Sequence, residues 1–294
     1  MLLASFTIGS GSRIGVLNRA REEIIDLSLA APGLPRDMAA FIALGIDALD
    51  TARRAVSASA PEAKRRLAEV ELMAPLPRPA RNILCIGKNY RDHANEVKSL
   101  PSGGSDLPEF PIVFTKAPST VIAPGVPIPS HLDSSRSTDY EGELGVIIGR
   151  GGRGITAADA MEHIFGYTVI NDVTARDLQR RHQQWFIGKS LDGYCPMGPA
   201  ILTADEVPDV RALCIRTQVN GELRQTGCVE DLIFDIPSLI ETLSAGMTLE
   251  PGDIIATGTP AGVGAGFNPP KYLQRGDRVS ITIDPIGTLE NPVE

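Results

Sequence analysis

The segment DYEGELGVIIGRGGRG at residues 139–154 limits the folds that this chain can adopt. Its tail has the G-x-G-x-x-G spacing of a dinucleotide-binding loop, which needs a buried parallel strand before it and a helix that starts on the glycines. The strand before this loop carries Glu141 and Glu143, whereas the strands of parallel sheets are apolar on both faces. We therefore interpret residues 149–154 as a surface turn with solvated arginines and keep nucleotide binding as an alternative.

Short strands separated by turn residues are the dominant pattern beyond residue 75. Asn220-Gly221, between CIRTQV and ELRQ, predicts a two-residue hairpin turn. In DRVSITID, Val279, Ile281 and Ile283 alternate with polar residues, as in a half-buried strand. We expect only a few helices in this region, at about residues 156–164, 174–184 and 236–244.

The first 75 residues predict a small α+β unit. Residues 2–8 and 13–17 have the pattern of strands around a Gly-Ser turn, and the segments at about 36–56 and 61–69 have the pattern of helices. The stretch MAPLPRPARN that follows has three prolines in ten residues and is typical of a stiff connector. We expect two domains, at residues 1–75 and 76–294, and a β-rich α+β fold.

The composition limits the partners of the chain. Its 294 residues carry a net charge of -8, which leaves no basic surplus to neutralise nucleic-acid phosphates or an anionic membrane. No apolar stretch approaches the roughly 18 residues of a membrane span, and the first residues do not resemble a signal peptide, so we expect a cytoplasmic protein. The four cysteines form no C-x-x-C pair and are expected to be buried free thiols: Cys85, Cys195, Cys214 and Cys228.

Three acidic residues are candidates for a metal site. Glu141 and Glu143 lie two apart on a predicted strand and so point to the same face, while Leu144 and its alternate neighbours pack on the other. Alone, such a pair is typical of a solvated strand face. Asp172 ends a second apolar strand in GYTVINDVTARD and completes an oxygen-only set that suits Mg²⁺, Mn²⁺ or Ca²⁺. The absence of a histidine at ligand spacing disfavours zinc.

His93 and Glu96 lie three apart in IGKNYRDHANE, a spacing that brings the two side chains together on a helical turn. Glu96 can then orient His93, or the pair can share a water as a general base. The alternative is an ordinary contact on a short surface helix. The loop PSGGSDLPEFP at residues 101–111 follows at once, and a short helix next to such a loop is typical of a lid.

Six segments together resemble the fumarylacetoacetate hydrolase family. They occur in the family's order and approximate spacing over about residues 80–294: IGKNYRDHANE, FTKAPST, DYEGELGVIIG, GYTVINDVTARDLQ, WFIGKSLDGYCPMGP and DIIATGTPAGVG. The resemblance implies a twisted β-roll catalytic domain behind the small N-terminal domain, in a homodimer. It also implies a Mg²⁺ or Mn²⁺ cofactor and a 2-oxo acid substrate with a further carbonyl group.

The same resemblance implies roles for single residues. Glu141, Glu143 and Asp172 would be the metal ligands, His93 with Glu96 would activate a water, and Lys189 would stabilise enolate charge. The implied substrate-binding residues are Gln179, Lys116, Tyr90, Arg91 and Thr259.

The resemblance also implies a reaction class. Fumarylacetoacetate hydrolases in the narrow sense have an aspartate ligand in the segment that reads IGKNY here, so this chain is more similar to the acylpyruvate hydrolase, hydroxyheptadienedioate isomerase and oxaloacetate decarboxylase branch. We expect a metal-dependent hydrolase that cleaves a C–C bond in a 2,4-dioxo acid of the acylpyruvate type and releases pyruvate or a related 2-oxo acid. A decarboxylase or isomerase acting on oxaloacetate or a related oxo-diacid is one alternative, and a non-catalytic ligand-binding relative is another.

Overall fold

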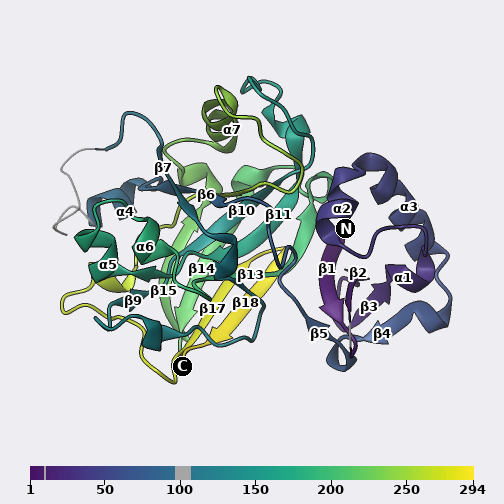
Figure 1. The fold of residues 1–294 in the computed structure, drawn as a ribbon, viewed down its shortest axis with the longest axis horizontal. Helices are drawn as coiled ribbons and strands as arrows, with labels where there is room; N and C mark the ends of the chain where they lie inside the picture. Colours follow the sequence, from purple (N-terminus) through teal and green to yellow (C-terminus); the bar gives the residue numbers. More distant parts are fainter. Residues whose placement is uncertain (10, 97–106) are drawn as a thin grey trace.

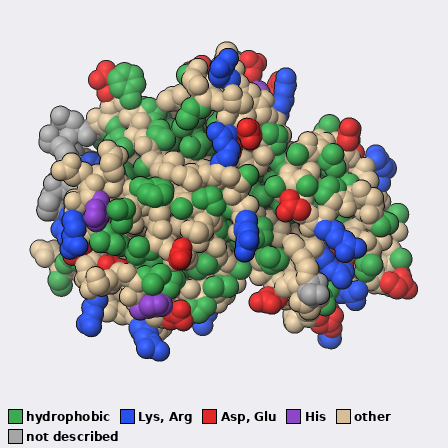
Figure 2. All heavy atoms as spheres, in the orientation of Figure 1, with side chains coloured by type: hydrophobic (Ala, Val, Ile, Leu, Met, Phe, Trp, Pro, Cys, Tyr) green, Lys and Arg blue, Asp and Glu red, His purple; other side chains and the backbone are tan. Residues whose placement is uncertain are grey.

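The chain folds into a small N-terminal lobe and a larger β-rich body (Figure 1). The computed structural model describes residues 1–9, 11–96 and 107–294. Figure 2 shows acidic and basic side chains scattered over the visible face. No helix in the described part of the chain combines the length and the apolar character needed to cross a bilayer.

Within the described residues, the N-terminal lobe contains five strands and three α-helices. They are β1 (Leu2–Thr7), β2 (Ser12–Leu17), β3 (Glu23–Asp26), β4 (Lys64–Arg66), β5 (Glu71–Leu72), α1 (Leu27–Ala30), α2 (Met38–Ala43) and α3 (Ile46–Ser57). The helix expected at 36–56 is interrupted at Gly45, which has a φ of +62°. The helix expected at 61–69 is wrong: residues 64–66 pair with β3, and only 3₁₀ turns flank them. Sheet pairing here overrides the local helical pattern.

One large mixed sheet runs through both lobes. Its order is β4-β3-β2-β1-β13-β11-β10-β16-β6-β7, with β5 paired to β1 and β8 to β13. The strands of the body in this sheet are β6 (Ile83–Gly87), β7 (Ile112–Lys116), β8 (Val121–Ile122), β10 (Gly142–Ile148), β11 (Ile164–Asn171), β13 (Cys195–Thr203) and β16 (Ile254–Ala256). Because β1 pairs with β13, the N-terminal lobe extends the sheet of the body. The boundary near residue 75 stays a prediction.

Two smaller sheets complete the body. The four-stranded sheet has the order β15-β14-β17-β18, and its strands are β14 (Cys214–Val219), β15 (Glu222–Cys228), β17 (Arg278–Ile283) and β18 (Gly287–Pro292). Asn220 and Gly221 both have positive φ at the β14–β15 turn, as the predicted hairpin requires. The two-stranded sheet pairs β9 (Thr138–Asp139) with β12 (Thr174–Ala175).

The expectation of four free thiols is wrong. Cys214 and Cys228 are opposite each other across β14 and β15 and form a disulfide, whereas Cys85 and Cys195 are free and buried. The separation of 14 residues carries no signal in the sequence, because the register of the hairpin decides which cysteines meet.

The described part of the body contains four short α-helices. They are α4 (Arg91–Glu96), α5 (Arg176–Arg181), α6 (Phe186–Lys189) and α7 (Ile236–Ser244). Helix α7 agrees with the expected segment, whereas the expected helix at 156–164 is only turns and a 3₁₀ segment, Ala160–His163. The segment 174–184 begins as strand β12 and becomes helical only at Arg176. The turn at 149–154 precedes no helix, and Gly152 instead forms a β-bridge with Leu249.

Candidate metal centre

The pairing of β10 with β11 brings the three acidic candidates together. Gly142 lies opposite Asn171, and the Asp172 amide donates to the Glu141 carbonyl at 2.8 Å, so Asp172 lies opposite Glu141 on the same face of the sheet. Glu141 stands one residue before β10 and Glu143 within it. One carboxylate oxygen from each residue lies within 4.8 Å of the other two.

The three carboxylates are buried. Glu141, Glu143 and Asp172 are 5%, 1% and 0% exposed, so the alternative of a solvated strand face is wrong. On the opposite face of β10, Leu144 and Val146 pack in the main apolar core, as the strand pattern predicts. The three carboxylates therefore lie inside the protein and not on a solvent-exposed strand face.

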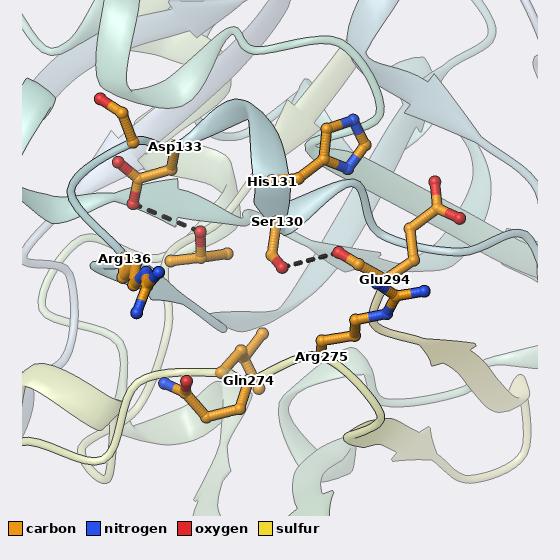
Figure 3. A pocket seen from close by; sticks show the side chains of 10 residues that line it. Ser130, His131, Asp133, Arg136, Gln274, Arg275 and Glu294 are labelled. Atoms are coloured by element: carbon orange, nitrogen blue, oxygen red, sulfur yellow. Dashed lines mark hydrogen bonds between the residues drawn. The ribbon is translucent and has the colours of Figure 1, made fainter.

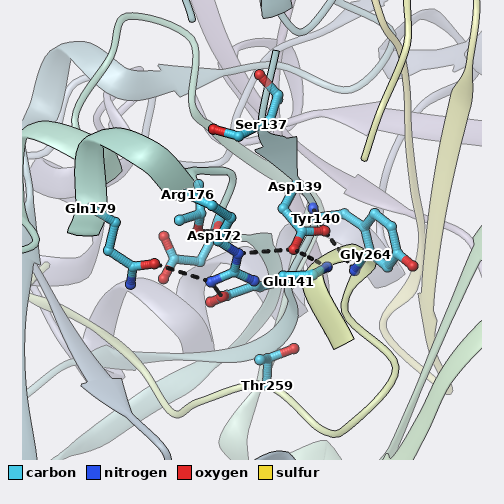
Figure 4. Close-up of polar contacts among 12 residues, drawn as sticks. Ser137, Asp139, Tyr140, Glu141, Asp172, Arg176, Gln179, Thr259 and Gly264 are labelled. Atoms are coloured by element: carbon cyan, nitrogen blue, oxygen red, sulfur yellow. Dashed lines mark hydrogen bonds and ion pairs between the residues drawn. The ribbon is translucent and has the colours of Figure 1, made fainter. Parts of the chain in front are cut away.

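Three cationic side chains reach the carboxylates from other elements. Lys189 Nζ, at the end of α6, lies 2.7 Å from Glu141 Oε2 and 2.6 Å from Asp172 Oδ2. Lys116 Nζ, at the end of β7, lies 2.7 Å from Asp172 Oδ1 and donates to a backbone carbonyl at 3.0 Å. Arg176 Nη1, in α5, lies 2.7 Å from Glu141 Oε1 (Figure 4). The site prediction omitted Arg176, although the matched motif GYTVINDVTARDLQ contains it.

The charges in the cluster are unevenly compensated. Burial raises the pKa of the Glu143 carboxyl well above its ordinary value, and the neighbouring Asp172 and Glu141 raise it further. Burial also acts to raise the pKa of Glu141, but Lys189 and Arg176 outweigh it and the pKa is lowered. For Lys189, burial acts to lower the pKa, and Asp172 and Glu141 reverse this. Glu143 is thus the carboxylate that lacks compensation.

The cluster fits a divalent cation. Within the described residues, Glu143 has no ion pair and receives only the Gly258 amide, at 2.9 Å. Asp172 Oδ1 forms an ion pair with Lys116 at 2.7 Å, and no other group in the described residues donates to this oxygen. Buried carboxylates that face one another are costly unless a positive charge joins them, and three oxygen donors suit Mg²⁺ or Mn²⁺. Glu141, Glu143 and Asp172 would hold the ion.

His93 and Glu96 form a pair on α4 beside this cluster. His93 is 6% exposed, and its Nδ1 lies 3.2 Å from Glu96 Oε2. After burial, Lys189 and Arg176, His93 is the next influence on the pKa of Glu141, which it lowers. The imidazole is therefore within electrostatic reach of the carboxylates. Most of the expected lid, at 101–111, lies outside the described residues.

The expected substrate-binding residues differ in how they relate to the cluster. Tyr90 is buried, and its hydroxyl has no hydrogen-bond partner within the described segments. Gln179 Oε1 accepts from Arg176 at 3.3 Å. The Thr259 hydroxyl donates to the Gly142 carbonyl at 2.9 Å and accepts from Gln225 at 2.7 Å, so it has a structural role.

The structure does not bring Arg91 to the carboxylates. Its side chain is exposed and lines a surface cavity of about 490 Å³, whose lining includes Tyr90 but none of the three acidic residues. The helical phase of α4 is the reason: His93 faces inwards, and Arg91, two residues earlier, faces outwards.

A larger cavity, of about 640 Å³, has none of the three acidic residues in its lining, which Figure 3 shows. Its lining includes Arg136 and Arg275, but also Asp133 and Glu294. Both oxygens of Asp133 already accept hydrogen bonds from Ser135 and Ser137. With charges of both signs and no ligand-like cluster of acidic residues, this cavity is not a candidate metal or catalytic site.

Known proteins resemble this chain over most of its length. Residues 82–294 match the family model described as Fumarylacetoacetate (FAA) hydrolase C-terminal. Oxaloacetate tautomerase YisK from Bacillus subtilis (strain 168) is 59% identical over 227 residues, which are 77% of this chain and 74% of that protein.

Solved structures support the same relationship over the whole chain. The fumarylacetoacetate hydrolase EaFAH from psychrophilic Exiguobacterium antarcticum has a TM-score of 0.84 at 43% identity and covers 100% of this chain and 99% of its own. The maleylpyruvate hydrolase from Sphingobium sp. SYK-6, in complex with manganese (II) ion and pyruvate, has a TM-score of 0.79 at 34% identity and covers 100% and 98%. The expected β-rich fold is confirmed, and the chain belongs to the fumarylacetoacetate hydrolase family.

Proposed function

We propose that this chain is a metal-dependent enzyme that interconverts the keto and enol forms of oxaloacetate or a closely related oxo-diacid. The observation that carries the proposal is the group of three buried carboxylate oxygens within 4.8 Å of one another, with Lys189 paired to two of these residues. The 59% identity to a protein named oxaloacetate tautomerase supports this substrate ahead of an acylpyruvate.

To bind a 2-oxo acid, the site needs groups that interact with its 2-oxo oxygen and with its carboxylate. The chemistry that a divalent ion supplies when bound is polarisation of the 2-oxo group, which makes the enol form easier to reach. Arg176 Nη2 is buried and has no hydrogen-bond partner within the described residues. A guanidinium N–H of this kind suits a carboxylate, and we assign it to a carboxylate of the substrate.

Tautomerisation breaks one C–H bond next to the 2-oxo group and forms one O–H bond. It therefore needs a group that takes the proton and a positive charge that stabilises the enolate oxygen. We assign the first role to His93, which Glu96 orients through Nδ1, so that Nε2 faces the proton to be moved. The second role falls to the buried ammonium of Lys189.

Hydrolysis of an acylpyruvate is the second candidate, and the His93–Glu96 pair is the observation that favours it. The pair would deprotonate a water that attacks the distal carbonyl. The C–C bond then breaks, its electron pair passes to the pyruvate enolate, and a proton restores pyruvate. Lys189 would stabilise this enolate as it does in tautomerisation, so both reactions use the same charges.

An ultraviolet assay of enol absorbance tests the leading proposal. Enol-oxaloacetate should decay faster with the protein and Mg²⁺ or Mn²⁺ than with the protein in EDTA, and equal rates would refute the proposal. Parallel assays follow pyruvate release from acylpyruvates and carbon dioxide release from oxaloacetate. His93→Ala should abolish hydrolysis, whereas decarboxylation of oxaloacetate should persist because it needs no activated water. Binding of oxo acids without turnover of any of them would instead identify a non-catalytic relative.

A further inference from the structure

One loop, at residues 258–265, donates backbone N–H groups to three carboxylates in and around the site. The Gly258 amide donates to Glu143 at 2.9 Å, and the Gly262 amide to Glu96 at 3.0 Å. The Gly264 amide donates at 2.7 Å to Asp139, a residue outside the proposed machinery. The loop therefore connects a candidate metal ligand, the histidine partner and a third buried acid.

Asp139 is completely buried at the end of β9, and both of its oxygens are used. Oδ1 accepts from the amides of Tyr140 at 2.9 Å and Gly264 at 2.7 Å. Oδ2 accepts from the Ala265 amide at 2.9 Å and from Arg176 Nε at 2.8 Å (Figure 4). A Cβ atom at position 264 would lie 2.6 Å from Asp139 Oδ1, so the close approach of loop and carboxylate requires glycine there.

Arg176 connects Asp139 to Glu141, one of the three candidate metal ligands. Its Nε faces Asp139, and its Nη1 lies 2.7 Å from Glu141 Oε1. The planar guanidinium can donate to two carboxylates at once. Its contact with Asp139 limits how far it can move towards Glu141. Glu141 is also a candidate metal ligand, so the position of Arg176 determines how strongly the guanidinium competes with a cation for this carboxylate.

We propose that Asp139 is a positioning residue of this site. It holds Arg176 between two carboxylates, so that the guanidinium orients Glu141 while sharing its charge with Asp139. The bonds of Asp139 to the 264–265 amides also connect Arg176 to the loop whose Gly262 amide donates to Glu96. The inference rests on the proposed function. Without the Asp139 charge, Arg176 would pair with Glu141 alone and would compete with the divalent ion.

The test is Asp139→Asn, read out by Mn²⁺ affinity and by kcat. The asparagine side chain has the size of aspartate but no charge, and its NH₂ group cannot accept a hydrogen bond. Arg176 therefore loses its ion pair with residue 139. We expect Mn²⁺ to bind about 10-fold more weakly and kcat to fall by about 10- to 100-fold, as is usual for groups that orient metal ligands. An Mn²⁺ affinity within twofold of the parent protein, in a folded variant, would overturn the proposal.

Asp133→Asn is the matched control. Asp133 is 2% exposed, and its carboxylate accepts hydrogen bonds from Ser135, Ser137 and Thr138, but it does not contact Arg176 or the 264–265 amides. Its Mn²⁺ affinity and kcat should stay within twofold of the parent. A loss equal to that of Asp139→Asn would show that both effects are merely structural.

A double-mutant cycle with Arg176→Gln tests whether Asp139 acts through the arginine. In the Arg176→Gln background, Asp139→Asn should change Mn²⁺ affinity by less than twofold, and an undiminished 10-fold effect would overturn the proposed route. If Asp139→Asn does not fold, Arg176→Lys replaces it: the ammonium cannot bridge both acids, and unchanged affinity would count against the proposal. Failure of the proposed function would look different, since the parent protein would then bind no Mn²⁺ or would bind it without turnover.

Discussion

At the scale of single residues, Glu143 has opposite effects on metal binding and on the stability of the metal-free fold. Glu143→Gln keeps the shape and removes a charge that faces Asp172 and Glu141. We expect divalent-ion affinity to fall by about 100-fold or more, since a direct ligand should matter at least as much as the groups that orient it. The metal-free variant should melt at a higher temperature than the parent. Calorimetry and thermal unfolding in EDTA measure the two effects, with the exposed Glu162→Gln as control.

The raised pKa of Glu143 also predicts how the site depends on pH. A carboxyl whose folded pKa is raised stabilises the fold fully below the ordinary value of 4.5, and this contribution is lost as the pH rises towards the folded pKa. Metal binding requires the ionised form, so it should release a proton and strengthen as the pH rises through this window. Titrations in buffers of different ionisation enthalpy count the protons released. Glu143→Gln should release fewer, and equal counts would contradict the assignment.

At the scale of elements, Gly266 in the loop after β16 should affect proton transfer more than metal binding. A Cβ atom at Gly266 would lie 2.0 Å from Glu96 Oε1, so Gly266→Ala must displace the partner of His93. We expect kcat to fall by about 10-fold or more, as for the loss of a general base, while metal affinity changes by less than about threefold. Gly246→Ala is the matched control, because its Cβ meets no atom within 4 Å. An equal fall in kcat for both variants would exclude a specific effect on Glu96.

At the scale of the whole molecule, the two lobes share one apolar core. Phe41 of α2 is fully buried and meets Phe165 of β11 edge-on, with 6.4 Å between ring centroids. Phe41→Ala should lower the free energy of unfolding by about 3–5 kcal/mol through lost burial and the cavity left behind. Chemical denaturation measures this. Phe110→Ala, at a side chain 73% exposed, should cost no more than about 0.5 kcal/mol, and independent unfolding of the lobes would contradict a shared core.

The homodimer that the family resemblance implies stays a prediction. Val113 on the edge strand β7 and Phe186 and Ile187 on α6 are large apolar side chains, each more than 40% exposed. These elements also carry Lys116 and Lys189 to the three buried carboxylates. Sedimentation should give about twice the 31.3 kDa chain mass, and Ile187→Asp should shift the protein towards a monomer if this face forms the contact.

The sequence by itself determined the features that depend on neighbouring residues. The alternation along 142–148 predicted that Leu144, Val146 and Ile148 share one face of β10, and Asn220-Gly221 predicted the hairpin turn, because strand faces and tight turns depend on local geometry. The alternation did not predict the burial of Ile147 in a second apolar cluster on the other face. Helix α7 was predicted too, because helix formation also depends on neighbouring residues. The His93–Glu96 contact was predicted too, since residues three apart on a helical turn are neighbours.

Only the tertiary structure decided the features that depend on distant segments. The sequence pointed to Glu141, Glu143 and Asp172 as one group, but the β10–β11 register places their oxygens within reach of one ion. The role of Arg176 as a bridge to Asp139 and the disulfide between Cys214 and Cys228 depend on segments that fold back on each other. Residues 64–66 became a strand because they pair with the backbone of β3, although their side chains are exposed or half-buried, and this long-range pairing outweighs the local helical propensity.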